Sequence, residues 1–167
     1  MYFKYMYLVD SISVRSMRLT KVSDYSLRVL LYLAVHPDRP VSIGEMSRAY
    51  RVSSHVVVKV VRLLVQEGAV TTVRGRRGGL RLNRSPAEIN VGALLRRTEK
   101  TWDVVECFNR ETNTCPIEPV CGLKVALTRA QRAFTGVLDE YTLADFLPRA
   151  REVKRLLRVN LDRSVSA

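Results

Sequence analysis

Apolar residues recur at intervals of three and four in the first well-patterned stretch of the chain, the spacing of one face of a helix. They are Val22, Tyr25, Val29, Leu30, Leu33 and Ala34. The pattern stops at His36-Pro37, because a proline disfavours helical backbone in the residue before it. The spacing therefore predicts a first helix that ends ahead of Pro37.

A short second helix is predicted from the residues at its start. Ser42 and Glu45 have the Ser-x-x-Glu spacing of a capping box. In that motif each side chain accepts a hydrogen bond from a free backbone N–H of the other residue. The helix should run to about Tyr50, and a short turn follows it.

A third helix is predicted from Ser53, its N-cap, to Gln66, and Gly68 suits the left-handed position beyond its end. Together with the second helix it forms a helix-turn-helix. Its inward residues are predicted to be Val57, Val60, Leu63 and Leu64. Its outward residues are predicted to be Ser53, Ser54, His55, Lys59 and Arg62.

The outward set suits DNA, because the major groove admits a helix whose N-terminal residues reach base edges. Ser53, Ser54 and His55 are therefore predicted to contact bases, and Lys59 and Arg62 to contact phosphates. An ordinary solvated helix face is the alternative interpretation.

A hairpin is predicted next, with strands at Ala69–Val73 and Leu80–Leu82 around a glycine-rich loop that permits positive φ. Between Gly68 and Arg84 the chain has no acidic residue but five arginines, which are Arg74, Arg76, Arg77, Arg81 and Arg84. Arginine enters narrow minor grooves, so the pattern favours a DNA-binding wing with Arg74, Arg76 and Arg77 at its tip. A merely soluble hairpin is the alternative; the Walker spacing of a phosphate-binding loop is absent.

Charge supports a polyanionic partner. The 167-residue chain has 28 Lys and Arg against 16 Asp and Glu, a net charge of +12 and a pI of about 10.2. A membrane surface is the rival of nucleic acid, but no apolar run approaches the ~20 residues that span a bilayer, and no secretory signal is evident. The protein is expected in the cytoplasm. With two histidines and no paired-carboxylate or triad arrangement, an enzyme is disfavoured.

Three cysteines, the only ones in the chain, lie within fifteen residues: Cys107, Cys115 and Cys121. Thiols grouped this closely in a reduced compartment are more often metal or redox ligands than disulfides. Three thiolates and one further donor can hold an iron-sulfur cluster or a tetrahedral zinc ion.

A helix that mediates dimerisation is predicted after the cysteines. Its apolar positions alternate in steps of four and three, the seam spacing of paired helices, at Leu123, Leu127, Ala130, Phe134, Val137 and Tyr141. Packing on its own domain is the alternative. A twofold dimer would place two recognition helices ~34 Å apart, matching a pseudo-palindromic operator.

The chain is thus expected to be mainly α with a small β-hairpin, a winged helix-turn-helix plus a long dimerisation helix. The predicted segments are an N-terminal extension over 1–16, disordered or a start-site artefact; the DNA-binding domain over 17–98, ending in a helix at Val91–Thr98; a cluster-binding loop over 99–122; the dimerisation helix over 123–147; and a basic tail over 148–167. The tail is interpreted as a solvated helix with Val153, Leu156 and Leu157 inward, and added phosphate contacts are the alternative.

Several short sequences, taken as a set, are typical of one family. They are Ser23-Asp24-Tyr25-Ser26-Leu27-Arg28, Arg74-Gly75-Arg76-Arg77-Gly78-Gly79-Leu80, Glu106-Cys107-Phe108, Cys115-Pro116-Ile117 and Cys121-Gly122-Leu123-Lys124. From Met17 to about Leu147 the chain resembles the winged-helix iron-sulfur transcription regulators typified by IscR and NsrR. The Asn113-Thr114-Cys115-Pro116 turn and Tyr141-Thr142-Leu143-Ala144-Asp145 are similar to the NsrR branch, whose members sense nitric oxide.

The resemblance implies a ligand set. IscR-like members are expected to use a histidine three residues after the last cysteine, where this chain has Lys124. NsrR-like members are expected to use an aspartate of the partner subunit, at the position of Asp24. The implied cofactor is an iron-sulfur cluster, 4Fe-4S in preference to 2Fe-2S, on Cys107, Cys115, Cys121 and Asp24. The alternative for Asp24 is an N-terminal helix residue paired with Arg28.

The implied function is a nitric oxide-responsive repressor that binds operator DNA as a homodimer while its cluster is intact and releases it on nitrosylation. The alternatives are an IscR-like iron-sulfur or redox-responsive regulator, and a zinc or thiol regulator without a cluster.

Overall fold

The computed structural model describes residues 18–165, with side chains up to Arg158, so the N-terminal extension predicted over 1–16 lies outside the described residues. Its elements are α1 (Lys21–Ala34), α2 (Ile43–Tyr50), α3 (Ser54–Gln66), β1 (Val70–Val73), β2 (Gly79–Leu82), α4 (Val91–Thr98), α5 (Gly122–Asp139) and α6 (Ala150–Val165). Short 3-10 turns occupy Pro86–Glu88, Glu106–Phe108, Glu118–Val120 and Leu143–Arg149. The predicted class, mainly α with one small hairpin, is confirmed.

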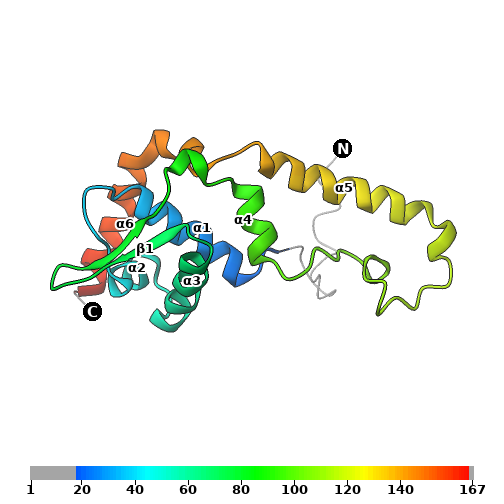
Figure 1. Cartoon of the computed structure of the whole chain (residues 1–167), viewed down its shortest axis with the longest axis horizontal. Coiled ribbons are helices and arrows are strands. Elements are labelled where there is room, and N and C mark those ends of the chain that lie inside the picture. Colours follow the sequence, from blue (N-terminus) through cyan, green and yellow to red (C-terminus); the bar gives the residue numbers. More distant parts are fainter. Residues whose placement is uncertain (1–17, 166–167) are drawn as a thin grey trace, which may run out of the picture.

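Two regions are evident in Figure 1. A body contains α1 to α4, the hairpin and α6, and an arm contains the loop 99–121 and α5. The core of the body forms where α1 and α2 both pack on α3, and Leu30, Tyr32, Met46 and Leu64 are fully buried there. This core fixes the helix-turn-helix independently of the arm.

The start of α2 differs from the predicted capping box. The Ser42 side chain accepts from the Glu45 backbone N–H at 3.1 Å, as expected. The Glu45 carboxylate instead accepts from the Tyr32 hydroxyl at 2.8 Å and pairs with Arg39. A buried tyrosine hydroxyl needs a hydrogen-bond partner, and this one ties α2 to α1. Burial alone would raise the pKa of Glu45, but the bonds from Arg39 and Tyr32 hold it below its ordinary value.

The inward face of α3 is close to the predicted one. Val57, Val60 and Leu64 are buried, but Val61 is also buried and Leu63 is only half-buried, so the inward assignment of Leu63 was wrong. Ser53 is the N-cap residue but makes no side-chain capping bond. Gly68 has a φ of +67°, the left-handed conformation expected after the helix.

The wing is an antiparallel pair in which Val70 faces Leu82 and Val73 faces Gly79. A third segment joins its base, because Val41 and Leu80 exchange backbone hydrogen bonds of 3.0 and 2.8 Å. A Cβ on Gly79 would lie 2.7 Å from the Val41 carbonyl oxygen, so only glycine allows this approach. The wing is thereby anchored to the loop between α1 and α2.

The chain beyond the cysteines differs from the predicted boundaries. Helix α5 ends at Asp139 instead of continuing to Leu147, and residues 143–149 form a 3-10 turn against the body. Helix α6 then packs on α2, with Leu157 buried and Val153 half-buried. Leu156 was predicted to face inward, but it is 56% exposed, so that prediction was wrong.

Among the described residues, no helix combines the length and the apolar character that crossing a membrane requires.

Candidate functional site

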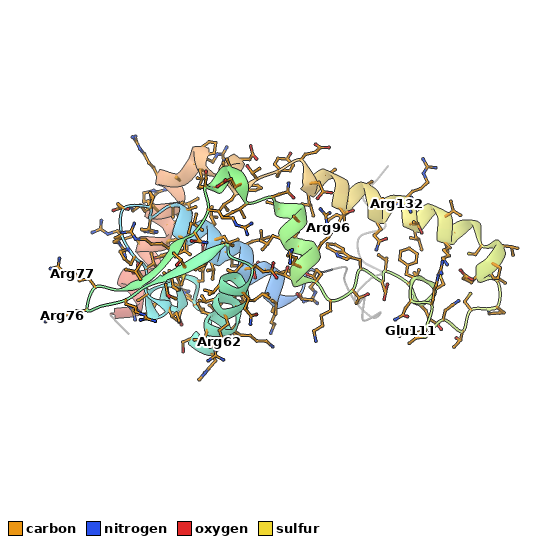
Figure 2. The ribbon with its side chains drawn as sticks, viewed as in Figure 1. Arg62, Arg76, Arg77, Arg96, Glu111 and Arg132 are labelled. Carbon is orange, nitrogen blue, oxygen red and sulfur yellow. The ribbon has the colours of Figure 1, made fainter. Side chains whose placement is uncertain are left out.

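The predicted DNA-contacting side chains of α3 share one exposed surface. Ser53, Ser54, His55, Lys59 and Arg62 are all exposed. Figure 2 shows Arg62 extending away from the body. Beside this surface, α1 and α3 border an open groove of about 640 Å³ lined by Val22, Val58 and Leu63 with His55, Lys59, Arg62 and Gln66.

The wing separates its five arginines into two groups. Arg74, Arg76 and Arg77 are exposed, and Arg76 and Arg77 lie at the far end of the hairpin in Figure 2. Gly75 has a φ of +110°, and a Cβ on Gly78 would lie 2.3 Å from the Val73 carbonyl oxygen, so both glycines are needed for the tight tip.

The other two arginines have structural contacts. Arg81 donates to the carbonyl oxygens of Pro37 at 2.9 Å and Asp38 at 3.3 Å. Arg84 donates to the Glu67 carbonyl oxygen at 3.1 Å. Arg81 and Arg84 therefore hold the base of the wing, whereas Arg74, Arg76 and Arg77 form no ion pair with any side chain that the structure describes.

The reading face, defined as the outward residues of α3 with Arg74, Arg76 and Arg77, carries basic side chains and no acidic one. Within the part of the chain that the structure describes, Lys59, Arg62 and the three wing-tip arginines have no ion-pair partner. Unpaired cations beside an exposed helix N-terminus suit a groove-and-phosphate contact with DNA.

The three cysteines are half-buried free thiols in the arm. Cys107 lies in a 3-10 turn and Cys121 is the residue before α5. Glu106 accepts from the backbone N–H of Thr114 at 2.7 Å and from its hydroxyl at 2.6 Å, which lowers the pKa of Glu106. These bonds hold the segment around Cys107 against the segment around Cys115.

The loop also packs along α5. Gln131 donates to the Trp102 carbonyl oxygen at 2.6 Å, and the Trp102 and Phe134 rings lie 6.0 Å apart. Lys124 pairs with Glu118. Its ammonium group has no lone pair, so it cannot replace a histidine ligand. The arm is therefore one packed unit of loop and helix.

The donors available to a bound cluster are the three cysteines and Asp24. The described residues contain no group of three or more His, Cys, Asp or Glu side chains that could hold a metal ion. Asp24 lies on α1, where its carboxylate accepts from Arg28 at 2.8 and 2.7 Å. Three soft thiols are the donors that iron-sulfur clusters require, so the chemistry of the set fits although a single chain does not gather it.

A joint, missed in the sequence reasoning, connects the arm to the body. Arg96 of α4 forms a bidentate pair with Asp139 at the end of α5. Asn90 donates to the carbonyl oxygens of Asp139 at 2.6 Å and Tyr141 at 3.2 Å. A Cβ on Gly92 would lie 2.0 Å from a carboxylate oxygen of Asp139. A glycine inside a helix is an unfavourable choice, and it was the sequence feature that could have indicated this contact.

On its opposite side α4 contacts α1. The hydroxyls of Ser23 and Thr98 are 2.7 Å apart and both residues are buried. Ser23 immediately precedes Asp24. A continuous set of contacts thus runs from α5 through α4 to the start of α1.

Comparison with known proteins gives concordant similarities. The Rrf2 model, described as an iron-dependent transcriptional regulator, matches residues 19–149. The HTH-type transcriptional regulator NsrR of Halalkalibacterium halodurans is 45% identical over 144 residues, which are 86% of this chain and 99% of that protein.

Two solved structures are also similar. The T. potens IscR structure has a TM-score of 0.66 and 25% identity, and covers 82% of this chain and 90% of its own. The structure of CymR, the global cysteine regulator of B. subtilis, has a TM-score of 0.61 and 27% identity, and covers 78% of this chain and 95% of its own.

Proposed function

The chain belongs to the Rrf2 family of transcriptional regulators, and we propose that it is a nitric oxide-responsive repressor that binds operator DNA as a homodimer. The observation that carries the proposal is the separation of two chemistries. A basic reading face lies on the body, three free thiols lie in the arm, and the joint of Asn90, Gly92, Arg96 and Asp139 connects them. Such a regulator is expected in the cytoplasm, where the operator lies.

DNA binding is assigned to the reading face. Ser53, Ser54 and His55 enter the major groove, Lys59 and Arg62 bind phosphates, and the wing arginines approach the minor groove. Two such faces in a twofold dimer, ~34 Å apart, would match a pseudo-palindromic operator.

Dimerisation is assigned to α5. Its apolar side chains are exposed in the single chain, including Leu123, Val125, Phe134 and Val137. Apolar surface of this kind is stabilised when a partner covers it. A second α5 is the proposed partner, because the apolar steps along the helix follow the seam spacing of a helix pair.

Cluster binding is assigned to Cys107, Cys115 and Cys121, with Asp24 of the partner subunit as the fourth ligand, and 4Fe-4S is favoured over 2Fe-2S. When bound, such a cluster supplies iron that reacts with nitric oxide. Three thiolates and one carboxylate would hold it. To serve as a ligand, the Asp24 carboxylate has to give up its bidentate contact with Arg28 and bind iron instead.

Signal transfer is assigned to the joint. A change in the cysteine loop moves α5, because Trp102, Gln131 and Phe134 pack the two together. Asp139 and Asn90 pass that movement to α4, and Ser23–Thr98 passes it to α1. A shift of a few ångströms between two reading faces would prevent simultaneous contact with both half-sites.

A regulator that uses its thiols or zinc without a cluster is the second candidate. The observation that fits it is that Cys107, Cys115 and Cys121 are half-buried free thiols, which can react or bind a single metal ion without a cluster. An IscR-like regulator fits less well, because Lys124 stands where a histidine is expected.

The deciding experiment is anaerobic reconstitution with iron and sulfide, performed on the wild type and on Cys107→Ser, Cys115→Ser and Cys121→Ser. The proposal expects visible thiolate-to-iron absorption in the wild type, its loss in each variant, and tighter operator binding by the reconstituted wild type. A colourless protein that binds one zinc ion, and that binds the operator equally well before and after reconstitution, would instead support the second candidate.

A further inference from the structure

Helix α6 carries a basic stripe, defined as Arg151, Lys154, Arg155 and Arg158. These residues recur at intervals of three and four, so they share one flank of the helix. All four are exposed. Glu152 and the exposed Leu156 fall on the other flank, and Val153 and Leu157 pack inward. The stripe is therefore a one-sided charged surface on a helix held by its apolar face.

The charge of the stripe is hardly offset. Lys154 approaches Asp38 at 3.9 Å with both side chains well exposed, a contact of small energetic weight. For the three arginines no ion pair is formed with any residue whose side chain is described. An anion can therefore bind the three arginines without displacing a strong ion-pair partner.

The surroundings of the stripe identify its partner. Helix α6 packs on α2, the first helix of the helix-turn-helix, and this helix crosses the DNA backbone in such motifs. The Lys154–Asp38 contact places the stripe beside the loop whose carbonyl oxygens hold Arg81 at the base of the wing. Arg48 and Arg51 at the end of α2 are also exposed. The stripe thus belongs to the same basic side of the body as the wing.

The stripe also lies far from the arm. In Figure 1 α6 and the wing tip lie on the side of the body that faces away from α5. If α5 forms the dimer axis, this side is the outermost part of each subunit. DNA that continues past the operator half-sites would pass there. The Rrf2 match covers residues 19–149, so the stripe lies beyond the matched segment.

We propose that the α6 stripe binds backbone phosphates of the DNA flanking the operator, outside the two half-sites. This inference rests on the proposed operator-binding dimer. Arginine and lysine contacts with phosphates position a protein on DNA without reading sequence. The stripe therefore adds affinity and salt dependence but no base specificity, and it makes binding depend on the length of the duplex.

The test compares two variants that lose the same charge. Arg155→Gln with Arg158→Gln removes half of the stripe, and Arg129→Gln with Arg132→Gln removes two exposed arginines from α5. Arg132 extends from the arm in Figure 2, far from the stripe. The probes are a duplex selected from a random pool by the wild type, in a short form of about 24 base pairs that covers two half-sites, and a long form with flanks.

Each phosphate contact contributes about 0.9 to the slope of log affinity against log salt. The stripe variant should therefore lower that slope by about 3 to 4 for a dimer on the long duplex and leave it unchanged on the short one. The arm variant should match the wild type on both, with its dimerisation checked by sedimentation. Unchanged slopes in the stripe variant, equal loss on both duplexes, or an equal effect of the arm variant would overturn the inference. A wild type that selects no duplex from the random pool would overturn the proposed function itself.

Discussion

The body and the arm differ in how they are held. The body has a core in which Leu30, Tyr32 and Leu64 are fully buried, whereas α5 in the arm has no buried residue. A region with a closed core is stable by itself, but a helix with exposed apolar residues is stabilised by what covers it. A partner or ligand can therefore change the arm without unfolding the DNA-binding body.

The largest expected effect is on the core of the body. Leu64→Ala removes a fully buried side chain and should lower the free energy of unfolding by about 3 kcal/mol. Chemical denaturation of the protein at a fixed concentration measures this. The matched change in the arm is Leu123→Ser, at a residue that is 66% exposed.

Leu123→Ser should leave the unfolding of the body almost unchanged but weaken dimerisation, seen by sedimentation over a range of concentrations. If Leu123→Ser destabilised the body as strongly as Leu64→Ala, the distinction between the two regions would be wrong.

The joint should be sensitive to a single methyl group. Gly92→Ala places a Cβ against Asp139 and should cost about 2 kcal/mol, because the contact includes backbone as well as carboxylate atoms. Gly136→Ala on α5 is the control, since nothing lies within 4 Å of its Cβ. That change should stabilise by up to about 1 kcal/mol. Thermal melts measure the change in stability of both variants. Equal changes for Gly92→Ala and Gly136→Ala would argue against a tight joint.

A smaller effect is expected from acid. The pKa of Glu45 is lower in the folded protein than in the unfolded chain, so its stabilisation is complete above the unfolded pKa and is lost as pH falls through the folded value. Glu45→Gln should cost about 1 kcal/mol at pH 7. The gap to wild type should narrow below about pH 4.5. Denaturant titrations at both pH values test this, and a gap independent of pH would exclude the carboxylate as its source.

The sequence predicted most of the body because its helices and wing depend on neighbouring residues. Ser42 caps its helix locally, and the glycines of the wing tip specify its turn. The exposure of the outward residues of α3 and of the wing arginines was also predictable from helical period and charge. The helix-turn-helix and the hairpin of this chain are therefore determined largely by interactions between residues that are close in sequence.

What the sequence did not predict depends on residues that are distant along the chain. The Arg96–Asp139 pair and the Tyr32–Glu45 bond join separate elements, and no periodicity identifies such partners. The exposure of Leu156 depends on which side of α6 packs on α2, and that packing is not encoded in the local sequence. Gathering of the three cysteines around a ligand, with Asp24 supplied by a second chain, stays a prediction.

The central claim is that the arm responds to nitric oxide and that the body binds operator DNA. The most direct test is an anaerobic titration of the reconstituted protein with nitric oxide, in which visible absorption and operator binding are followed on the same sample. The account predicts that absorption and binding fall together, and that Arg96→Met, which breaks the joint, loses absorption with a much smaller loss of binding. Absorption that disappears while wild-type operator binding stays constant would contradict it.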